Sequence, residues 1–202
     1  MPQGISFRPA LPTLSEGTAL ARNHDMSADG LFRLMLGAAY TRVLAEAYVE
    51  PAQDLSFEHV TFAVRGYAVV GMVSAHSSAQ HAGSSDEPFI GAAGWRVVRL
   101  GVVTMLANRL LRFLGDIPDS DFYLQAVAVD PDARGEGVGT VLFEHAESQA
   151  MNADAGRLTL DVAVKNTAAR RLYERLGMHV EATSPRFSPL PGLQVHRMAK
   201  PL

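Results

Sequence analysis

The stretch from Leu124 to Ala146, LQAVAVDPDARGEGVGTVLFEHA, decides the fold. It opens with an apolar, valine-rich run that predicts a buried strand ending at Val129. Three alternating glycines then lead into an amphipathic segment that predicts a helix. A helix N-terminus leaves backbone N–H groups unpaired and carries partial positive charge, and glycines let an anion approach the backbone closely. The stretch therefore predicts a strand, a phosphate-binding turn and a helix.

A second motif follows, from Asn166 to Met178. Asn166 is well suited to cap a helix, and Tyr173 comes seven residues later, close to two helical turns. The two side chains are therefore expected on one side of that helix. The tyrosine hydroxyl is then a candidate proton donor at the end of a cleft, and the alternative is an ordinary half-buried core tyrosine.

Outward from these motifs, the sequence predicts an α/β fold in which a central mixed sheet carries helices on both faces. Expected strands and helices alternate along the chain, with a hairpin over residues 60–73, a loop over 77–87 and a helix over 91–114 that breaks near Gly94 or Gly101. At about 150 residues per domain, 202 residues predict one domain, with a helical insertion at about 77–121.

Composition excludes several classes of protein. Hydrophobic residues make up 48% of the chain and charged residues 19%, which excludes a wholly disordered chain. The net charge of -3 provides no global basic field, so no nucleic-acid partner is expected. There is no cysteine, which rules out disulfides, thiolate metal sites and a cysteine nucleophile and fits a cytoplasmic location. Arginines interrupt the longest apolar stretch, and the N-terminus shows no apolar run of signal-peptide length, so no membrane contact is expected.

Together, and in this order, the two motifs resemble those of the GNAT superfamily of N-acetyltransferases. The resemblance implies a GNAT-type fold, acetyl-CoA as co-substrate, and a small-molecule or protein amine as acceptor. It also implies a general-acid role for Tyr173 as the thiolate leaves. The implied cofactor-binding residues are Val127, Ala128, Val129, Arg134, Gly135, Glu136, Gly137, Val138, Gly139, Thr140 and Asn166.

Two other functions stay open at this point. One is a non-catalytic acyl-CoA-binding or sensing module, and the other is a dinucleotide-binding protein of Rossmann type, whose glycine pattern fits less well. Because the chain has no cysteine, an enzyme of this kind would use direct attack of the amine on the thioester. A backbone N–H at Val127 would then stabilise the oxyanion.

The general base is where the sequence departs from the resemblance. Many members carry a glutamate on or near this strand, whereas this chain has Gln125, which cannot act as a base. Asp121, Tyr123 or a water-mediated route are the alternatives, with His76 as a further candidate or simply a strand-end histidine. His76 and His81 suggest a metal pair, but no carboxylate or thiol pattern accompanies them in the sequence, so no metal is predicted. Residues 89–114 are expected to form an acceptor-site wall or the surface of a possible homodimer.

Overall fold

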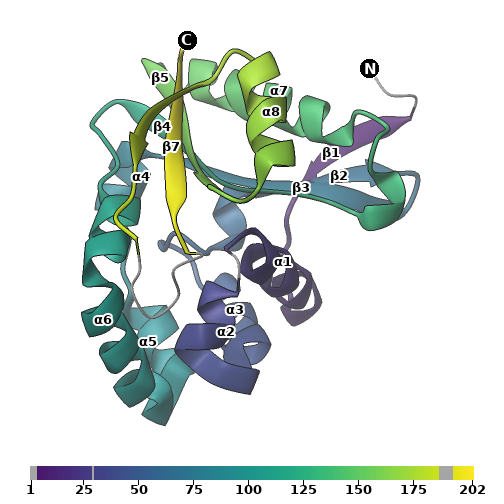
Figure 1. The fold of residues 1–202 in the computed structure, drawn as a ribbon. Helices are drawn as coiled ribbons and strands as arrows, with labels where there is room; N and C mark the ends of the chain where they lie inside the picture. The colour runs from purple at the N-terminus through teal and green to yellow at the C-terminus, as the bar shows by residue number, and fades with distance from the viewer. Residues whose placement is uncertain (1–3, 29, 187–192) are drawn as a thin grey trace.

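A single twisted sheet organises the molecule. The computed structural model describes residues 4–28, 30–186 and 193–202, and Figure 1 shows their arrangement. Within these residues seven strands pair in the order β1-β2-β3-β4-β5-β7-β6, and all neighbours are antiparallel except β4 and β5. The strands are β1 Ile5–Pro9, β2 Val60–Arg65, β3 Ala68–Ser77, β4 Asp121–Val129, β5 Arg157–Ala163, β6 His179–Thr183 and β7 Val195–Pro201.

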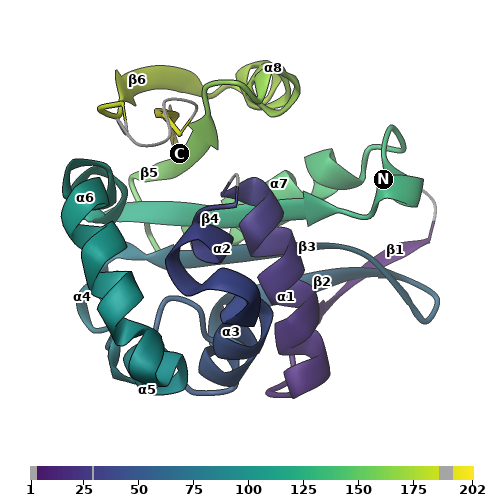
Figure 2. The ribbon, with the colours of Figure 1, turned by 60° about the horizontal axis from the view of Figure 1, so that its bottom comes forward.

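Helices cover both faces of this sheet, as the sequence predicts. In Figure 2, α1 to α6 lie on one side of the central strands, whereas α7 and α8 lie on the other. The α-helices are α1 Leu14–Ser27, α2 Leu31–Leu36, α3 Tyr40–Tyr48, α4 Ser78–Ala82, α5 Glu87–Ala93, α6 Val97–Gly115, α7 Val138–Asn152 and α8 Thr167–Arg175. Short 3-10 turns are η1 Gly37–Ala39, η2 Phe57–His59, η3 Gly94–Arg96 and η4 Pro131–Ala133. The prediction of a mixed sheet with helices on both faces is confirmed.

The strand, turn and helix of the first motif form the centre of the core. Leu124 on β4 and Leu142 and Phe143 on α7 are almost completely buried in one apolar cluster with Leu158 of β5. Full burial of each such side chain stabilises the fold by about 1.5–3 kcal/mol. The apolar stripe of α7 thus fixes the helix against the sheet, and with it the turn that joins them.

One local prediction is wrong in part. Within residues 77–87, where a loop was expected, Ser78–Ala82 form the short helix α4 and Glu87 begins α5, which leaves residues 83–86 between the two helices. The side chains of Ser77 and Gln80 form a capping box, a helix-start signal that is present in the sequence and outweighs its polar, glycine-containing composition. Nearer the N-terminus, Gly37 adopts a positive φ of 65° and separates α2 from α3.

The helical segment between β3 and β4 exposes an apolar face. It breaks at Gly94 and runs unbroken through Gly101. Taken together, α5, η3 and α6 cover Glu87–Gly115, which among the described residues is long and apolar enough to cross a membrane by length and composition alone. Only 11% of the most apolar part of this segment is buried. The exposed apolar side chains include Ile90, Trp95, Val97, Val98, Val102, Met105 and Leu106. The expectations of no membrane contact, of a homodimer and of an insertion at this place all stay predictions.

A buried ion pair fastens this helical segment to the sheet. Arg197 on β7 donates two hydrogen bonds to Asp161 on β5, at 3.1 and 2.7 Å, and both side chains are nearly inaccessible to solvent. The same guanidinium donates to the backbone carbonyls of Phe113, Leu114 and Asp116 at the end of α6. One arginine therefore satisfies a buried carboxylate and the carbonyl end of a helix together.

Replacing this arginine should destabilise the whole fold. Arg197→Met leaves Asp161 as an unpaired buried charge, so we expect the free energy of unfolding in urea to fall by about 3–5 kcal/mol. Arg170→Met is the control, because Arg170 forms an exposed pair with Glu174 within α8, which is worth less than about 1 kcal/mol. Equal and small losses in the two variants would contradict the structural role assigned to Arg197.

Candidate active site

The site begins where two parallel strands part. β4 pairs with β3 along nearly all of its length, from Phe122 to Val129, but with β5 only from Asp121 to Leu124. In the described part of the chain, the backbone of residues 126–129 therefore has no strand partner on the β5 side. An exposed strand edge of this kind can accept an extended ligand through main-chain hydrogen bonds.

A β-bulge lies at this parting point. The register of β3 and β4 shifts so that Ser74 faces Ala126 whereas Ala75 faces Leu124, which leaves Gln125 as the extra residue. Its amide oxygen accepts a hydrogen bond of 2.9 Å from the Ser74 hydroxyl. Bulges of this kind re-aim side chains beside functional sites. The Ser74 hydroxyl thus holds Gln125 at the position where the family resemblance predicts a general base.

The turn after β4 shapes an outer groove of about 660 Å³. Gly135 and Gly137 have φ values of 80° and 82°, a conformation that strains other residues, and α7 starts after them without a side-chain cap. The first N–H groups of α7 have no partner within the helix and can receive an anion. The predicted cofactor residues that line this groove are Val127, Ala128, Val129, Arg134, Gly135, Gly137, Val138, Gly139, Thr140 and Asn166.

Glu136 is the predicted cofactor residue that does not line the groove. Its carboxylate instead forms an ion pair with Arg65 at the end of β2. Asn23 on α1 and Arg175 on α8 do line the groove, and sequence reasoning missed both. Asn23 lies outside the two motifs, whereas Arg175 lies in the second motif but was given no role. Arg170 on α8 forms an ion pair with Glu174 and does not line the groove.

Asn166 and Tyr173 lie where the groove meets a second cavity. Asn166 caps α8, since its side-chain oxygen accepts a hydrogen bond of 3.1 Å from the Ala169 N–H. Tyr173 is buried, and burial raises the pKa of its hydroxyl to about 12. Both residues line both cavities, as do Val127 and Ala169. As expected, Asn166 and Tyr173 lie on the same side of α8. That side faces the place where the outer groove opens into the second cavity.

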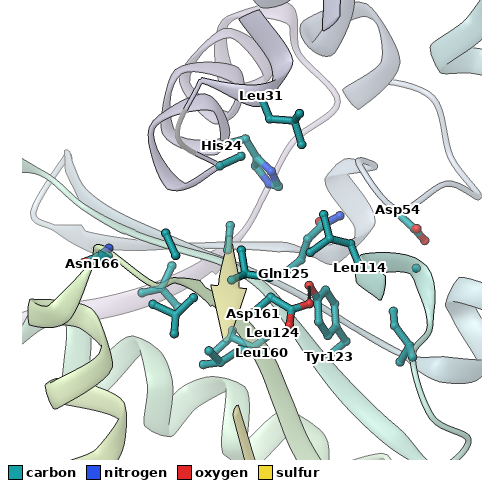
Figure 3. Close-up of a pocket in the computed structure, with 18 of the residues that line it drawn as sticks. His24, Leu31, Asp54, Leu114, Tyr123, Leu124, Gln125, Leu160, Asp161 and Asn166 are labelled. Atoms are coloured by element: carbon teal, nitrogen blue, oxygen red, sulfur yellow. Dashed lines mark hydrogen bonds between the residues drawn. The ribbon is translucent and has the colours of Figure 1, made fainter. Parts of the chain in front are cut away.

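The second, inner cavity measures about 330 Å³ and lies between the helical layer and the sheet. Figure 3 shows His24 pointing towards it from α1, Tyr123, Gln125 and Asp161 on the sheet, and Asn166 and Asp54 at opposite sides. Burial lowers the pKa of His24 to about 4, so this side chain is neutral at pH 7. The cavity thus combines a mainly apolar lining with a few inward polar groups, as ligand sites do.

The structure argues against Asp121 and Tyr123 as the general base. Asp121 is buried, binds Arg157 through both carboxylate oxygens at 3.0 and 2.8 Å, and lies outside the lining of both cavities. Tyr123 lines the inner cavity, but its hydroxyl donates to Asp161 at 2.9 Å, and burial raises its pKa well above the ordinary value. A hydroxyl with so high a pKa stays protonated at neutral pH and does not accept a proton.

His76 does lie at the end of β3, as the alternative interpretation expected, but it is buried and not at the surface. It is 1% exposed, and its ring centroid lies 5.7 Å from that of His81. Asp54, from the segment before η2, lies beside them and makes a 2.7 Å contact with His81. A carboxylate does accompany the two histidines in space, although it comes from a distant part of the chain and no pattern in the sequence shows it. Spacing along the sequence carries no signal for such an encounter.

Comparisons with known proteins agree with this geometry. The sequence model of the acetyltransferase (GNAT) family matches residues 31–178. The chain is 33% identical over 100 residues to the [ribosomal protein bS18]-alanine N-acetyltransferase of Salmonella typhimurium, covering 49% of this chain and 66% of that protein. It is 37% identical over 62 residues to peptidyl-lysine N-acetyltransferase YjaB of the same organism, covering 31% and 39%. The chain thus spans less than two thirds of these relatives' length.

Among solved structures, an N-acetyltransferase from Staphylococcus aureus Mu50 superposes with a TM-score of 0.65 at 17% identity, covering 96% of this chain and 99% of that one. A similarity at this level of identity shows a shared fold. With the family model matching well over half of the sequence, the chain belongs to the acetyltransferase (GNAT) family.

Proposed function

We propose that this protein transfers the acetyl group of acetyl-CoA to a primary amine at the end or on a side chain of a peptide. The observation that carries the proposal is the junction of the two cavities at Val127, Asn166 and Tyr173. A groove suited to the donor opens there into a separate space suited to an acceptor. Transfer between two bound substrates requires this arrangement, because the amine must reach the thioester in a near-attack geometry.

The outer groove fits the chemistry of coenzyme A. The free edge of β4 can pair with the amide groups of the pantetheine arm as a strand would. The uncapped start of α7 and the cation of Arg134 suit the pyrophosphate. Under this proposal, the thioester lies near Val127, where the edge of β4 and the inner cavity meet.

The reaction then proceeds by direct attack. The amine lone pair forms a bond to the thioester carbonyl carbon, and the Val127 N–H stabilises the oxyanion. The carbon–sulfur bond breaks as the intermediate collapses, and the leaving sulfur takes the hydroxyl proton of Tyr173. The proton that the attacking amine releases then restores the Tyr173 hydroxyl. Because the pKa of Tyr173 is raised to about 12, its hydroxyl is fully protonated at neutral pH and available as the acid.

The size of the inner cavity favours the end of a peptide over a larger free metabolite. Its volume of about 330 Å³ is at the lower limit for sites that enclose a drug-sized molecule. It has room for one side chain or one terminal residue. The names of two relatives, an alanine and a peptidyl-lysine acetyltransferase, point to the same class of acceptor. With no cysteine in the sequence, we also propose a cytoplasmic location.

A panel of acceptors tests this proposal. Thiol release from acetyl-CoA should occur with peptides that carry a free N-terminal alanine or a lysine, and mass spectrometry should locate the acetyl group on the amine. Polyamines should be poor acceptors, because they offer no peptide backbone beside the reacting amine. Turnover with small amines alone would overturn the peptide class. Binding of acetyl-CoA without any turnover would instead support the non-catalytic alternative.

Gly137→Asp should abolish binding of coenzyme A. The substitution places a carboxylate at the anion site and forces a residue with a side chain into a positive φ of 82°. Calorimetry should show at least a hundredfold weaker binding. Gly94→Asp is the matched control, since Gly94 also has a positive φ, at 56°, has open space around it and lies outside both cavities. Equal affinity in the two variants would remove the basis for the donor site.

Tyr173→Phe should lower the rate of transfer and leave donor binding intact. Loss of a general acid typically costs about 10²–10⁴-fold in rate. We therefore expect kcat to fall within that range while the Kd for acetyl-CoA, measured by calorimetry, stays within a factor of about three. The ring still fills its buried place, so the melting temperature should change little. An unchanged kcat would exclude the acid role.

A further inference from the structure

Three possible metal ligands converge at the side of the inner cavity opposite Asn166. Asp54, which Figure 3 shows across the cavity from Asn166, comes from the segment between α3 and η2. His76 comes from the end of β3 and His81 from α4. One ring nitrogen from each histidine and one carboxylate oxygen all lie within 4.8 Å of one another. In a tetrahedral zinc site, neighbouring ligand atoms lie roughly 3.3 Å apart, so small side-chain rotations suffice to close this set around an ion.

The carboxylate is only half satisfied. Oδ2 of Asp54 lies 2.7 Å from Nδ1 of His81, whereas the buried Oδ1 has no hydrogen-bond partner among the described residues. A buried polar atom without a partner costs about 1–3 kcal/mol, and more when it is charged. A cation at this place would supply the missing interaction.

Both histidines are oriented as metal-binding histidines are. Nδ1 of His76 faces the carbonyl oxygen of Ser77 at 3.3 Å, and Nε2 of His81 faces that of Gly115 at the same distance. A ligating histidine almost always donates its other ring N–H to a carbonyl or carboxylate, which fixes the tautomer. With Nδ1 of His76 donating to Ser77, its Nε2 keeps a lone pair for a metal. Nδ1 of His81 donates to Oδ2 of Asp54 in this structure. On metal binding the ring proton would move to Nε2, which then donates to the Gly115 carbonyl, so that Nδ1 and Oδ2 both ligate the ion.

A third histidine lies beside this set. The ring centroid of His59 is 5.5 Å from that of His76. Burial lowers the pKa of both rings below the ordinary value.

We propose that Asp54, His76 and His81 bind a divalent transition-metal ion of the zinc class. Two imidazoles and one carboxylate are a ligand set typical of Zn²⁺ sites that keep a fourth position open. Mg²⁺ and Ca²⁺ prefer oxygen ligands and would fit poorly. Since all three residues line the inner cavity, the open position faces the space assigned to the acceptor. The metal site itself is independent of whether the protein is a transferase.

Direct metal binding tests the proposal. The full chain, with any affinity tag removed and after treatment with a chelator, is titrated with Zn²⁺ in a calorimeter and with Co²⁺ in a spectrophotometer. We expect one ion per chain, a melting temperature that rises with Zn²⁺, and the intense visible absorption of Co²⁺ in a tetrahedral site. Mg²⁺ should produce neither a heat signal nor a shift in melting temperature.

Two variants locate the site. Asp54→Asn and His81→Gln should each weaken Zn²⁺ binding at least tenfold and remove the cobalt spectrum, while far-ultraviolet circular dichroism stays that of the wild type. His179→Gln is the control, because His179 is an exposed histidine on β6 outside both cavities, and it should bind like the wild type. The proposal is overturned if wild-type protein binds no Zn²⁺, or if the folded Asp54 and His81 variants bind it as tightly as the control.

Discussion

A buried polar network lies where β4 and β5 part, at the gap on which the site depends. Tyr123 of β4 donates to Asp161 of β5, and Asp161 is paired with Arg197 of β7. The ladder between β4 and β5 ends at Leu124 and Leu160, one residue before Asp161. Side chains thus take over the connection where the backbone pairing stops. Because buried polar groups need partners, Tyr123, Asp161 and Arg197 hold one another in place at the point where the strands part.

The same network determines where the helical layer ends. Burial raises the pKa of Asp161, while Arg197 and the Tyr123 hydroxyl favour its charged form. The guanidinium also binds the carbonyl end of α6, where the helix carries partial negative charge. Leu110 and Leu114 on that helix line the inner cavity. The position of this cavity wall therefore follows from an ion pair inside the sheet, and not only from apolar contacts between helices.

The sequence could predict the parts of the site that depend on neighbouring residues, but not the parts that depend on contacts between distant segments. The strand, turn and helix around Gly137, and the cap and tyrosine at Asn166 and Tyr173, depend on residues close in sequence, where periodicity and capping rules apply. The bulge at Gln125 carries no glycine or proline to signal it. Asp54 and His81 meet only because β2, β3 and α4 bring them together. Encounters of this kind depend on topology, so propensity and spacing cannot reveal them.

The two halves of the site are consequently built in different ways. Around the outer groove, which we propose for the donor, backbone groups of β4 and α7 form the lining, and a short local sequence suffices to specify them. Around the inner cavity, which we propose for the acceptor, side chains from separate elements meet at the end of α6, where His81 faces the Gly115 carbonyl and Arg197 binds that of Asp116. The end of α6 thus contacts both polar clusters and lines the inner cavity through Leu114 and Gly115. Because the inner cavity shares Val127, Asn166 and Tyr173 with the outer groove, the two halves of the site also meet at common residues.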